Sequence, residues 1–333
     1  MLLLFEVQEI MNIRPRRNRK NTVIRDMIQE THLSVDHLIY PLFLMDGDNH
    51  KREIDSLPGN YRWSLDLLMK EISDCVNLGI RSFVLFPVVD ESLKDNIGTY
   101  SYAEDNFYLK AIYSIKSTFP EIMLMSDVAL DPYSSDGHDG IVKNGKILND
   151  ETLPILAKMS VAQAQAGIDI IGPSDMMDGR IGYIRKALNE NGFTDTNIMS
   201  YSAKYASAFY GPFRDALDSV PKIGDKKTYQ MNPANKREAM IEAELDIKEG
   251  ADALMVKPAI CYLDVIHQLK MSFHLPITAY NVSGECAMLY AAARNGWLDY
   301  NLAMPEMLIS IKRAGADGIL TYFAKDFAKM MNS

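Results

Sequence analysis

Eight short apolar runs recur along this 333-residue chain, and each is rich in the β-branched and aromatic residues that favour strands. They cover residues 38–44, 82–89, 122–129, 168–171, 198–201, 253–256, 276–280 and 318–322. A run that is apolar at successive positions buries both of its faces, and such strands are typical of a parallel sheet covered by helices. The series therefore predicts an α/β fold in which strands and helices alternate.

Amphipathic segments at helical spacing lie between the runs, the clearest at residues 64–78, 153–166, 235–249, 263–271 and 304–313. Four segments are followed by a glycine that can serve as a left-handed C-cap, namely Gly79, Gly167, Gly250 and Gly315. Eight strands that alternate with helices predict a (β/α)8 TIM barrel. A doubly wound open sheet is the alternative, but no glycine-rich phosphate loop follows the first run.

The residues before the first strand are expected to form an extended N-terminal arm. We place the arm at residues 1–36 and the barrel at residues 37–333. The arm holds a basic cluster at residues 14–20, and we expect it to pack against a neighbouring subunit, which predicts a homo-oligomer. RNA binding by this cluster is the alternative. The net charge of −9 argues against nucleic acid as the main partner, because a nucleic-acid binder needs a basic surface.

The cysteines and the start of the chain bear on the cellular compartment. The three cysteines, at positions 75, 261 and 286, are too widely spaced for a disulfide framework or a zinc motif, which favours a reducing cytoplasm. The apolar start at residues 1–7 is too short to span a membrane, and no basic region precedes it as in a secretory signal. We expect a cytoplasmic protein with no membrane partner.

Two lysines end neighbouring strands of the predicted barrel, Lys204 after the fifth run and Lys257 after the sixth. Barrel active sites gather at the carboxyl ends of the strands, and adjacent strands lie about 4.8 Å apart, so the two amines should meet. Burial disfavours an ammonium, and a neutral lysine attacks a carbonyl to form a Schiff base. The pair predicts an enzyme that holds two carbonyl substrates. Strand-end lysines that reach solvent, or a class I aldolase with one Schiff-base lysine, are the alternatives.

Two loops at the same end of the predicted barrel carry polar side chains. Residues 131–139 are rich in Asp and Ser, and such oxygen donors suit magnesium better than zinc, although a turn capped by its own side chains has the same composition. A long insertion at about residues 205–235 is expected to form an active-site lid. Its Arg214 and Lys227 could clamp a carboxylate or lie at the surface as ordinary charges.

Longer motifs resemble a known family. The segments at residues 131–140, 204–214, 227–233, 255–258, 280–285 and 311–317 are similar, in this order, to those of the porphobilinogen synthase (5-aminolevulinate dehydratase) family. The similarity runs from about residue 14 to the C-terminus, so the segment from Met1 to Met11 lies outside it, and Met11 is an alternative start. The resemblance implies a TIM-barrel lyase, a hydro-lyase, that condenses two 5-aminolevulinate molecules to porphobilinogen in tetrapyrrole and haem biosynthesis.

The resemblance also implies roles for individual residues. Lys257 is expected to form a Schiff base with the substrate that becomes the propionate side of the product, and Lys204 with the substrate on the acetate side. The carboxylate on the acetate side is expected to be bound by Arg214, Lys227 and Gln230, and the other carboxylate by Ser283 and Tyr322.

The metal-binding positions distinguish this chain from part of the family. Zinc-dependent members carry three cysteines after the third strand, where this chain has Ala129, Asp131 and Asp139, so we expect no zinc. The resemblance to the aspartate-rich branch implies allosteric magnesium bound by Glu242, for which an ordinary exposed helix glutamate is the alternative. Whether the two aspartates hold a cation such as potassium, or act without one, is left open. The family also implies a homo-octamer in which the arm embraces a neighbouring subunit.

Overall fold

The chain divides into two compact units, with the division between Leu33 and Ser34. The computed structural model describes residues 13–217, 221–222 and 224–332. Met1 and Met11 lie outside the described residues, as do residues 218–220 and 223 of the expected lid. The two units are described separately.

The first unit is a short helical segment. It contains the 3₁₀-helix η1 (Pro15–Arg19) and the α-helix α2 (Thr22–Met27). Asn21 caps α2, because its side-chain oxygen accepts a hydrogen bond of 3.0 Å from the backbone N–H of Ile24. None of the described side chains of this unit is buried.

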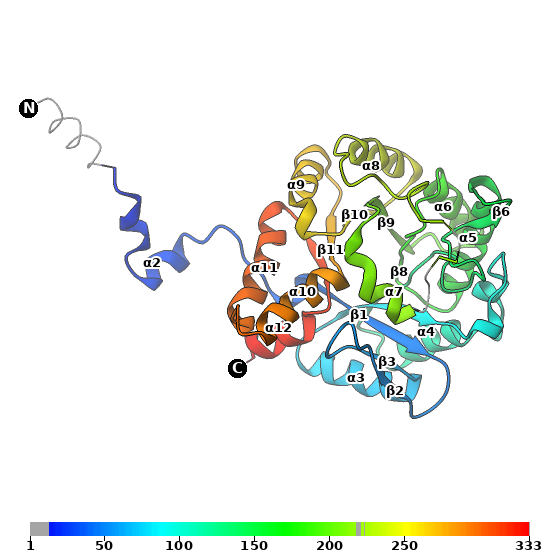
Figure 1. The fold of residues 1–333 in the computed structure, drawn as a ribbon, viewed down its shortest axis with the longest axis horizontal. Helices are drawn as coiled ribbons and strands as arrows, with labels where there is room; N and C mark the ends of the chain where they lie inside the picture. The colour runs from blue at the N-terminus through cyan, green and yellow to red at the C-terminus, as the bar shows by residue number, and fades with distance from the viewer. Residues whose placement is uncertain (1–12, 218–220, 223, 333) are drawn as a thin grey trace, which may run out of the picture. The chain divides into compact units, whose positions relative to one another are not determined.

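Within the described residues, the second unit is built on a closed barrel of eight parallel strands. These are β1 (Leu38–Met45), β4 (Ser82–Val88), β5 (Met123–Met125), β8 (Ile170–Ile171), β9 (Asn197–Lys204), β10 (Ala253–Lys257), β11 (Ile277–Asn281) and β12 (Gly318–Thr321). Each strand pairs with the next along the chain, and β12 pairs with β1 to close the sheet. Figure 1 shows the strands at the centre and the helices around them. The predicted TIM barrel is confirmed, and every strand overlaps a predicted run.

Helices follow the strands and cover the outside of the barrel. The α-helices are α3 (Leu65–Asn77), α4 (Phe107–Thr118), α5 (Asn149–Gln165), α6 (Arg180–Glu190), α7 (Gly211–Leu217), α8 (Glu238–Glu249), α9 (Leu263–Ser272), α10 (Ser283–Arg294), α11 (Tyr300–Ala314) and α12 (Ala324–Met331). Short 3₁₀-helices are η2 (Val35–His37), η3 (Glu91–Leu93), η4 (Thr99–Tyr102), η5 (Ala208–Tyr210) and η6 (Ile260–Tyr262). The five predicted helices correspond to α3, α5, α8, α9 and α11.

The glycines that were expected to end helices have the required backbone conformation. Gly79, Gly167, Gly250 and Gly315 have φ angles of 92°, 100°, 104° and 122°. Residues with a Cβ atom rarely adopt such angles, so glycine allows the chain to leave each helix and enter the following strand.

Two hairpins extend the barrel. The strands β2 (Lys51–Glu53) and β3 (Tyr61–Trp63) form the first, and β3 continues the sheet beside β1. The strands β6 (Ile141–Lys143) and β7 (Lys146–Leu148) form the second, directly after the aspartate-rich loop. No helix in the described part of the chain is both long and apolar enough to span a membrane.

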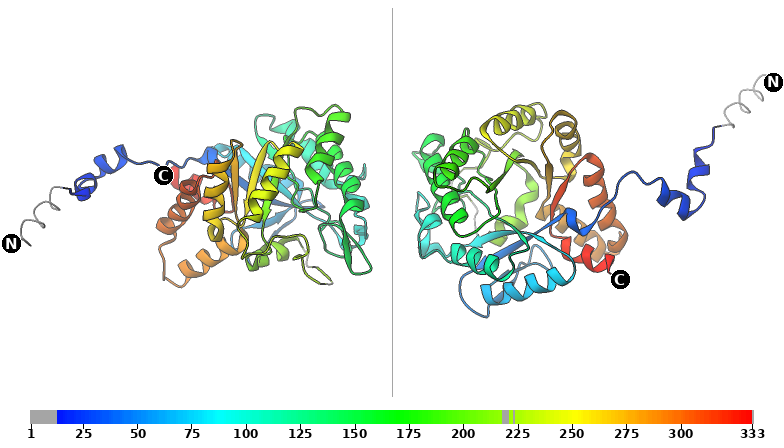
Figure 2. Two further views of the ribbon diagram at one scale, coloured as in Figure 1. Left: turned by 90° about the horizontal axis from the view of Figure 1, so that it is seen from above. Right: turned by 180° about the vertical axis from the view of Figure 1, so that it is seen from behind.

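The carboxyl ends of the strands carry the helices α7 and α10. These helices are packed against each other (Figure 1), and the side view in Figure 2 shows both, in green and orange, toward one end of the barrel. Parallel pairing brings the polar residues that follow β5, β9, β10 and β11 to the same end. This end therefore holds the candidate active site.

Candidate active site

Lys204 and Lys257 are neighbours at the carboxyl ends of β9 and β10. Their Cα atoms are register partners in the sheet, and the two residues are only 5% and 4% exposed. Lysines are seldom buried to this degree unless a partner or a function requires it. The fold therefore brings together the two amines that the sequence singled out, and neither is a strand-end lysine that reaches solvent.

Lys257 has no acidic side chain at ion-pair distance among the described residues. Burial lowers the pKa of its amine to about 7, and the nearby charge of Lys204 contributes in the same direction. The more distant carboxylates of Asp127, Asp131 and Asp139 oppose this shift without cancelling it. A substantial fraction of Lys257 is consequently neutral at physiological pH, which is the form that attacks a carbonyl.

Lys204 has polar partners instead. Its ammonium group donates a hydrogen bond to the backbone oxygen of Ser174, and its Nζ atom lies 3.4 Å from Oδ2 of Asp139. Burial alone would raise the pKa of Asp139, but the charges of Lys204 and Lys226 outweigh it and lower that pKa to about 2. Asp139 is thus a carboxylate at neutral pH, and it holds the Lys204 side chain in place.

Lys226, which sequence analysis did not single out, lies in the predicted lid, and its side chain reaches the aspartates of the loop at residues 131–139. Its Nζ atom lies 2.7 Å from Oδ1 of Asp139 and 3.1 Å from Oδ2 of Asp131. Burial disfavours the charge of Lys226, but the two carboxylates outweigh that effect and raise its pKa. No group of three or more metal-binding side chains occurs among the described residues. The donor set of Asp131 and Asp139 does not fit a resident cation, because an ammonium group already binds it.

Asp127 is a further buried carboxyl group in the site. It lies just beyond β5, and its Oδ1 atom has no hydrogen-bond partner in the described part of the chain. Burial raises its pKa to about 7 with a contribution from Asp131, while Ser174 and the charges of Lys204 and Lys257 oppose the shift. A carboxyl group with such a pKa can accept or donate a proton at neutral pH. Its position at a strand end was the sequence signal that could have identified it.

Arg214 and Gln230 come from the predicted lid. Arg214 lies in α7 and is partly exposed. Burial raises the pKa of the hydroxyl groups of Tyr210 and Tyr229, and the nearby charge of Arg214 opposes this shift. Gln230 is 4% exposed, and its Oε1 atom has no hydrogen-bond partner among the described residues. Buried polar atoms are normally paired, so this acceptor oxygen is available to a hydrogen-bond donor.

The adjacent residues Lys226 and Lys227 point in different directions. The Lys227 side chain is 74% exposed, and its Nζ atom lies 3.3 Å from Asp225. The Lys226 side chain is 7% exposed. Of these two lysines, Lys226 is therefore the one buried against Asp131 and Asp139, whereas the sequence favoured Lys227, which borders the cavity of Glu242.

Ser283 and Tyr322 border the surroundings of Lys257. Ser283 begins α10, and its Oγ atom accepts a hydrogen bond of 2.9 Å from the backbone N–H of Phe213. The hydroxyl groups of Tyr322 and Tyr280 lie 2.7 Å apart. The Tyr280 ring centroid is 4.6 Å from Nζ of Lys257, so Tyr322 is linked to the surroundings of this amine through Tyr280. Both residues that were expected to bind a carboxylate thus contact an aromatic neighbour of Lys257.

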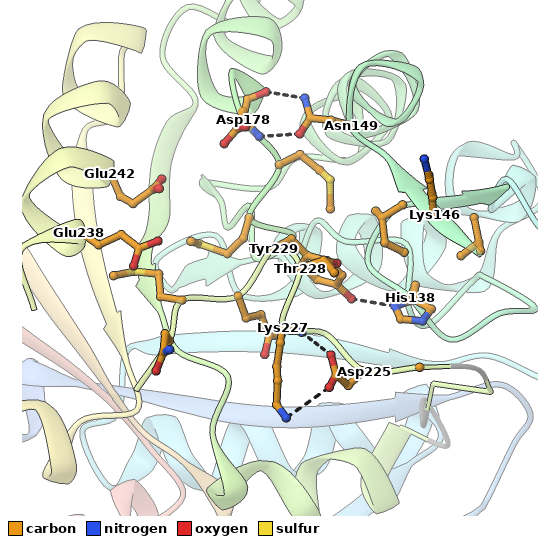
Figure 3. Close-up of a pocket in the computed structure, with 18 of the residues that line it drawn as sticks. His138, Lys146, Asn149, Asp178, Asp225, Lys227, Thr228, Tyr229, Glu238 and Glu242 are labelled. Atoms are coloured by element: carbon orange, nitrogen blue, oxygen red, sulfur yellow. Dashed lines mark hydrogen bonds and ion pairs between the residues drawn. The ribbon is translucent and has the colours of Figure 1, made fainter. Parts of the chain in front are cut away.

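Glu242 lies in a cavity of about 870 Å³ that neither Lys204 nor Lys257 lines. Figure 3 shows Glu238 and Glu242 on one side of this cavity and Asp178 on another. Burial raises the pKa of Glu242 to about 7, with Arg180 opposing the shift and the nearby acidic groups reinforcing it. Magnesium usually binds one or two carboxylates and retains several waters, so this partly buried acidic side chain fits a hydrated magnesium ion.

The buried Arg180 connects the surroundings of Glu242 with the lysines. Its Nη1 atom lies 3.3 Å from Oδ1 of Asp246, and its Nε atom lies 3.7 Å from Oδ2 of Asp175. Asp175 directly follows Ser174, whose carbonyl oxygen accepts the hydrogen bond from Lys204. Sequence reasoning missed this link, because Arg180 and Asp246 are 66 residues apart and each resembles an ordinary helix charge.

The fold and the site together define an α/β barrel with two buried lysines side by side at the carboxyl ends of neighbouring strands. The family model described as delta-aminolevulinic acid dehydratase matches residues 12–330. The chain is 53% identical over 319 residues to the Chlamydia pneumoniae protein of that name, and the match covers 96% of each of the two chains. It is 49% identical over 318 residues to the Bacillus subtilis protein of that name, covering 96% of this chain and 98% of the other.

A solved structure gives the same result. The Toxoplasma gondii delta-aminolevulinic acid dehydratase (porphobilinogen synthase), in complex with the reaction product porphobilinogen, is 51% identical with a TM-score of 0.94. The match covers 95% of this chain and 91% of the other. The chain therefore belongs to the delta-aminolevulinic acid dehydratase, or porphobilinogen synthase, family. The predicted family, TIM barrel and enzyme class, a hydro-lyase of tetrapyrrole biosynthesis, are confirmed.

Proposed function

We propose that this chain condenses two molecules of 5-aminolevulinate to porphobilinogen, and that Lys257 and Lys204 each form a Schiff base with one of them. The observation that carries this proposal is the buried register pair of the two lysines. Two amines in one cleft match two ketone groups, whereas a class I aldolase needs only one such lysine. Membership of the family supports the same reaction.

The chemistry starts from the neutral amine of Lys257. The amine attacks the ketone carbon of one substrate, and loss of water gives a Schiff base. Lys204 reacts in the same way with the second substrate. Loss of a proton beside one imine gives an enamine, whose carbon attacks the other imine carbon. Ring closure by a substrate amino group and release of both lysines complete the reaction, so that two substrates give one porphobilinogen and two waters.

Asp127 is suited to accept the proton that is lost on the way to the enamine. Its carboxyl pKa of about 7 and its unpaired Oδ1 atom support this role. The charges of Lys204 and Lys257 both act on the group, so it belongs to the same cleft as the Schiff bases.

We assign one substrate carboxylate to Arg214, Gln230 and Lys226, and the other to Ser283 and Tyr322. Lys226 takes the place of Lys227 in this assignment, because the latter is exposed and the former is buried in the cleft. A guanidinium and an amide can bind the two oxygens of a carboxylate together, which fixes the orientation of the substrate. Ser283 and Tyr322 lie on the side of Lys257, which suits its substrate.

Magnesium is proposed as an allosteric cofactor bound by Glu242 through one carboxylate and its own waters. The charge of the ion would relieve the repulsion among the acidic groups around Glu242. Zinc is not expected, because Ala129, Asp131 and Asp139 offer no thiolate. No step of the reaction is assigned to a metal, and no potassium site is proposed at the aspartates, since Lys226 binds them.

We also propose a homo-octamer in the cytoplasm, with residues 1–36 as the arm that contacts a neighbouring subunit. Val23 and Met27 on α2 are 77% and 76% exposed, which provides an apolar surface for a second subunit. Cys75 and Cys286 are buried free thiols, which suits a reducing compartment.

The test combines product formation with trapping. Purified protein should form porphobilinogen from 5-aminolevulinate, and borohydride added with substrate should attach the substrate carbon skeleton to the peptide that contains Lys257. Chelation should lower the rate or disperse the oligomer, and magnesium rather than zinc should restore it. A protein that gives neither product nor adduct under any metal condition would refute the proposal.

A further inference from the structure

The amine of Lys257 is surrounded by aromatic rings. The ring centroids lie 4.6–5.3 Å from its Nζ atom and belong to Tyr201, Tyr210, Phe213 and Tyr280. Two of them come from the barrel strands β9 and β11, and the other two from η5 and α7. Phe213, at 4.7 Å, is the member of this group that has no hydroxyl.

Phe213 is fixed from two directions. Its backbone N–H donates a hydrogen bond of 2.9 Å to Oγ of Ser283 on α10. Its ring meets Phe86 edge-on with centroids 5.0 Å apart and lies 6.0 Å from Phe43, so it packs on β4 and β1. The ring thus lies between the aromatic side chains of β1 and β4 and the amine of Lys257.

We propose that Phe213 is a positioning residue that keeps water away from Lys257 and so maintains its amine in the nucleophilic form. The inference rests on the proposed Schiff-base function of Lys257 and adds a requirement to it. Phe213 itself has no reactive group, and it acts only through the surroundings of the amine.

The charges around Lys257 show why an apolar neighbour is needed. The charges that act on the amine are those of one lysine and three carboxyl groups, namely Lys204, Asp127, Asp131 and Asp139. The other titratable neighbours are tyrosines, of which Tyr201, Tyr210 and Tyr280 present their rings to the amine and Tyr322 is hydrogen-bonded to Tyr280. The three carboxylates favour the ammonium form, yet burial is the largest influence and lowers the pKa of Lys257. An aromatic face attracts a cation and so favours the ammonium form of Lys257, whereas exclusion of water by the ring disfavours that form. The two effects of the ring therefore oppose each other. Replacement of the ring shows which effect is larger.

Gly284 provides an independent way to move Phe213. A Cβ atom at Gly284 would lie 2.5 Å from the backbone oxygen and 2.8 Å from the Cα atom of Phe209. The backbone of η5 can therefore lie against α10 only if residue 284 is glycine. Alanine at this helical position favours the helix itself, so the G284A substitution should displace η5 and α7 without weakening α10.

The experiment measures the rate of borohydride trapping of 5-aminolevulinate at Lys257 as a function of pH, with the adduct quantified on its peptide by mass spectrometry. The variants are F213A, F213L and G284A. The control is F193A, which removes a partly exposed ring that precedes β9 at the other end of the strand. Melting temperatures are recorded for every variant.

We expect the acid limb of the trapping profile to move upward by about one pH unit in F213A, because entry of water shifts the amine toward the ordinary lysine pKa. F213L should shift less, since leucine still excludes water, and G284A should shift in the same direction with the Phe213 ring retained. F193A should leave the limb in place. If F213A does not fold, F213L and G284A carry the test.

An acid limb that stays in place in F213A and G284A, even with a lower rate, would reduce Phe213 to a structural role and overturn the inference. A downward shift would mean that attraction of the cation by the ring is the larger effect, which also overturns it. Absence of any adduct in the wild-type protein would instead refute the proposed function. The two failures are thereby distinguished.

Discussion

The Nζ atom of Lys226 lies 2.7 Å from Oδ1 of Asp139, and the two side chains are 7% and 1% exposed. The same ammonium group also pairs with Asp131, so the charge of the aspartate-rich loop is balanced by the chain's own lysine. A buried carboxylate that loses its partner is left with an uncompensated charge. This pair should consequently be sensitive to substitution, although neither residue forms a covalent bond in the proposed reaction.

The K226A substitution should lower kcat/KM for porphobilinogen formation by about 100-fold, because loss of one partner from a buried charge pair costs about 2–5 kcal/mol. The adjacent K227A substitution is the matched control. Its exposed pair with Asp225 should change kcat/KM by less than about threefold, as expected for a surface ion pair. Steady-state kinetics on both variants tests the assignment. The opposite order of effects would return the carboxylate-binding role to Lys227.

The E242Q substitution should abolish the stabilisation that magnesium gives to the chelated protein. A ligand that binds only the folded state at about 100 times its Kd adds about 2.7 kcal/mol, which is readily seen in a melting curve. E244Q is the control, because Glu244 lies two residues away on α8 and pairs with Lys248 on the exposed surface. A magnesium-dependent rise in Tm that persists in E242Q would place the ion elsewhere.

The D127N substitution should lower kcat by about 10²–10⁴-fold, the usual contribution of a positioned general base. The first Schiff base at Lys257 should still be trapped by borohydride, since that step does not need the carboxylate. Asp127 accepts a proton only when it is ionised, so kcat of the wild type should rise as pH increases through about 7, the pKa of this group. Single-turnover kinetics across this range tests both points. An undiminished kcat in D127N would exclude it as the proton acceptor.

The sequence predicts the barrel because its strands are apolar at nearly every position. Strands that are buried on both faces show this pattern whichever neighbours they pack against. The helices α2, α4, α6, α7, α10 and α12 were not predicted. In α10 the first turn buries the polar residues Ser283 and Glu285, and in α6 the side chain of Arg180 is buried, so neither helix shows a simple apolar stripe. In these two helices, inward-facing polar residues therefore obscure the helical pattern of the sequence.

The two lysines could be predicted because the end of a strand has a known place in a barrel. The choice between Lys226 and Lys227 could not, since a loop has no period that tells which of two adjacent side chains points inward. The same holds for Arg180 and Asp246, whose contact depends on how α6 and α8 pack together. Tertiary packing therefore decides the partners of charged residues that the sequence alone presents as equivalent.

The contact between Arg180 and Asp246 yields a prediction about stability. The D246N substitution removes the charge that faces Nη1 at 3.3 Å, while Arg180 remains 2% exposed and cannot reach solvent. The Ser200 hydroxyl donates a hydrogen bond of 2.6 Å to Oδ2 of Asp246, and the single oxygen of an asparagine cannot serve both Ser200 and Arg180 in the same geometry. We expect the free energy of unfolding to fall by about 3–5 kcal/mol, as for other buried pairs that lose one partner.

The control for this prediction is K186A on the surface of α6. Lys186 lies 3.8 Å from Glu190, and the two side chains are 75% and 64% exposed, so its loss should change the free energy of unfolding by less than about 1 kcal/mol. Denaturant titrations of both variants, at fixed magnesium and protein concentration, measure the difference. If D246N is no less stable than K186A, then Arg180 must be neutralised mainly by Asp175, and the connection from α8 to the carbonyl of Ser174 is not needed for the fold.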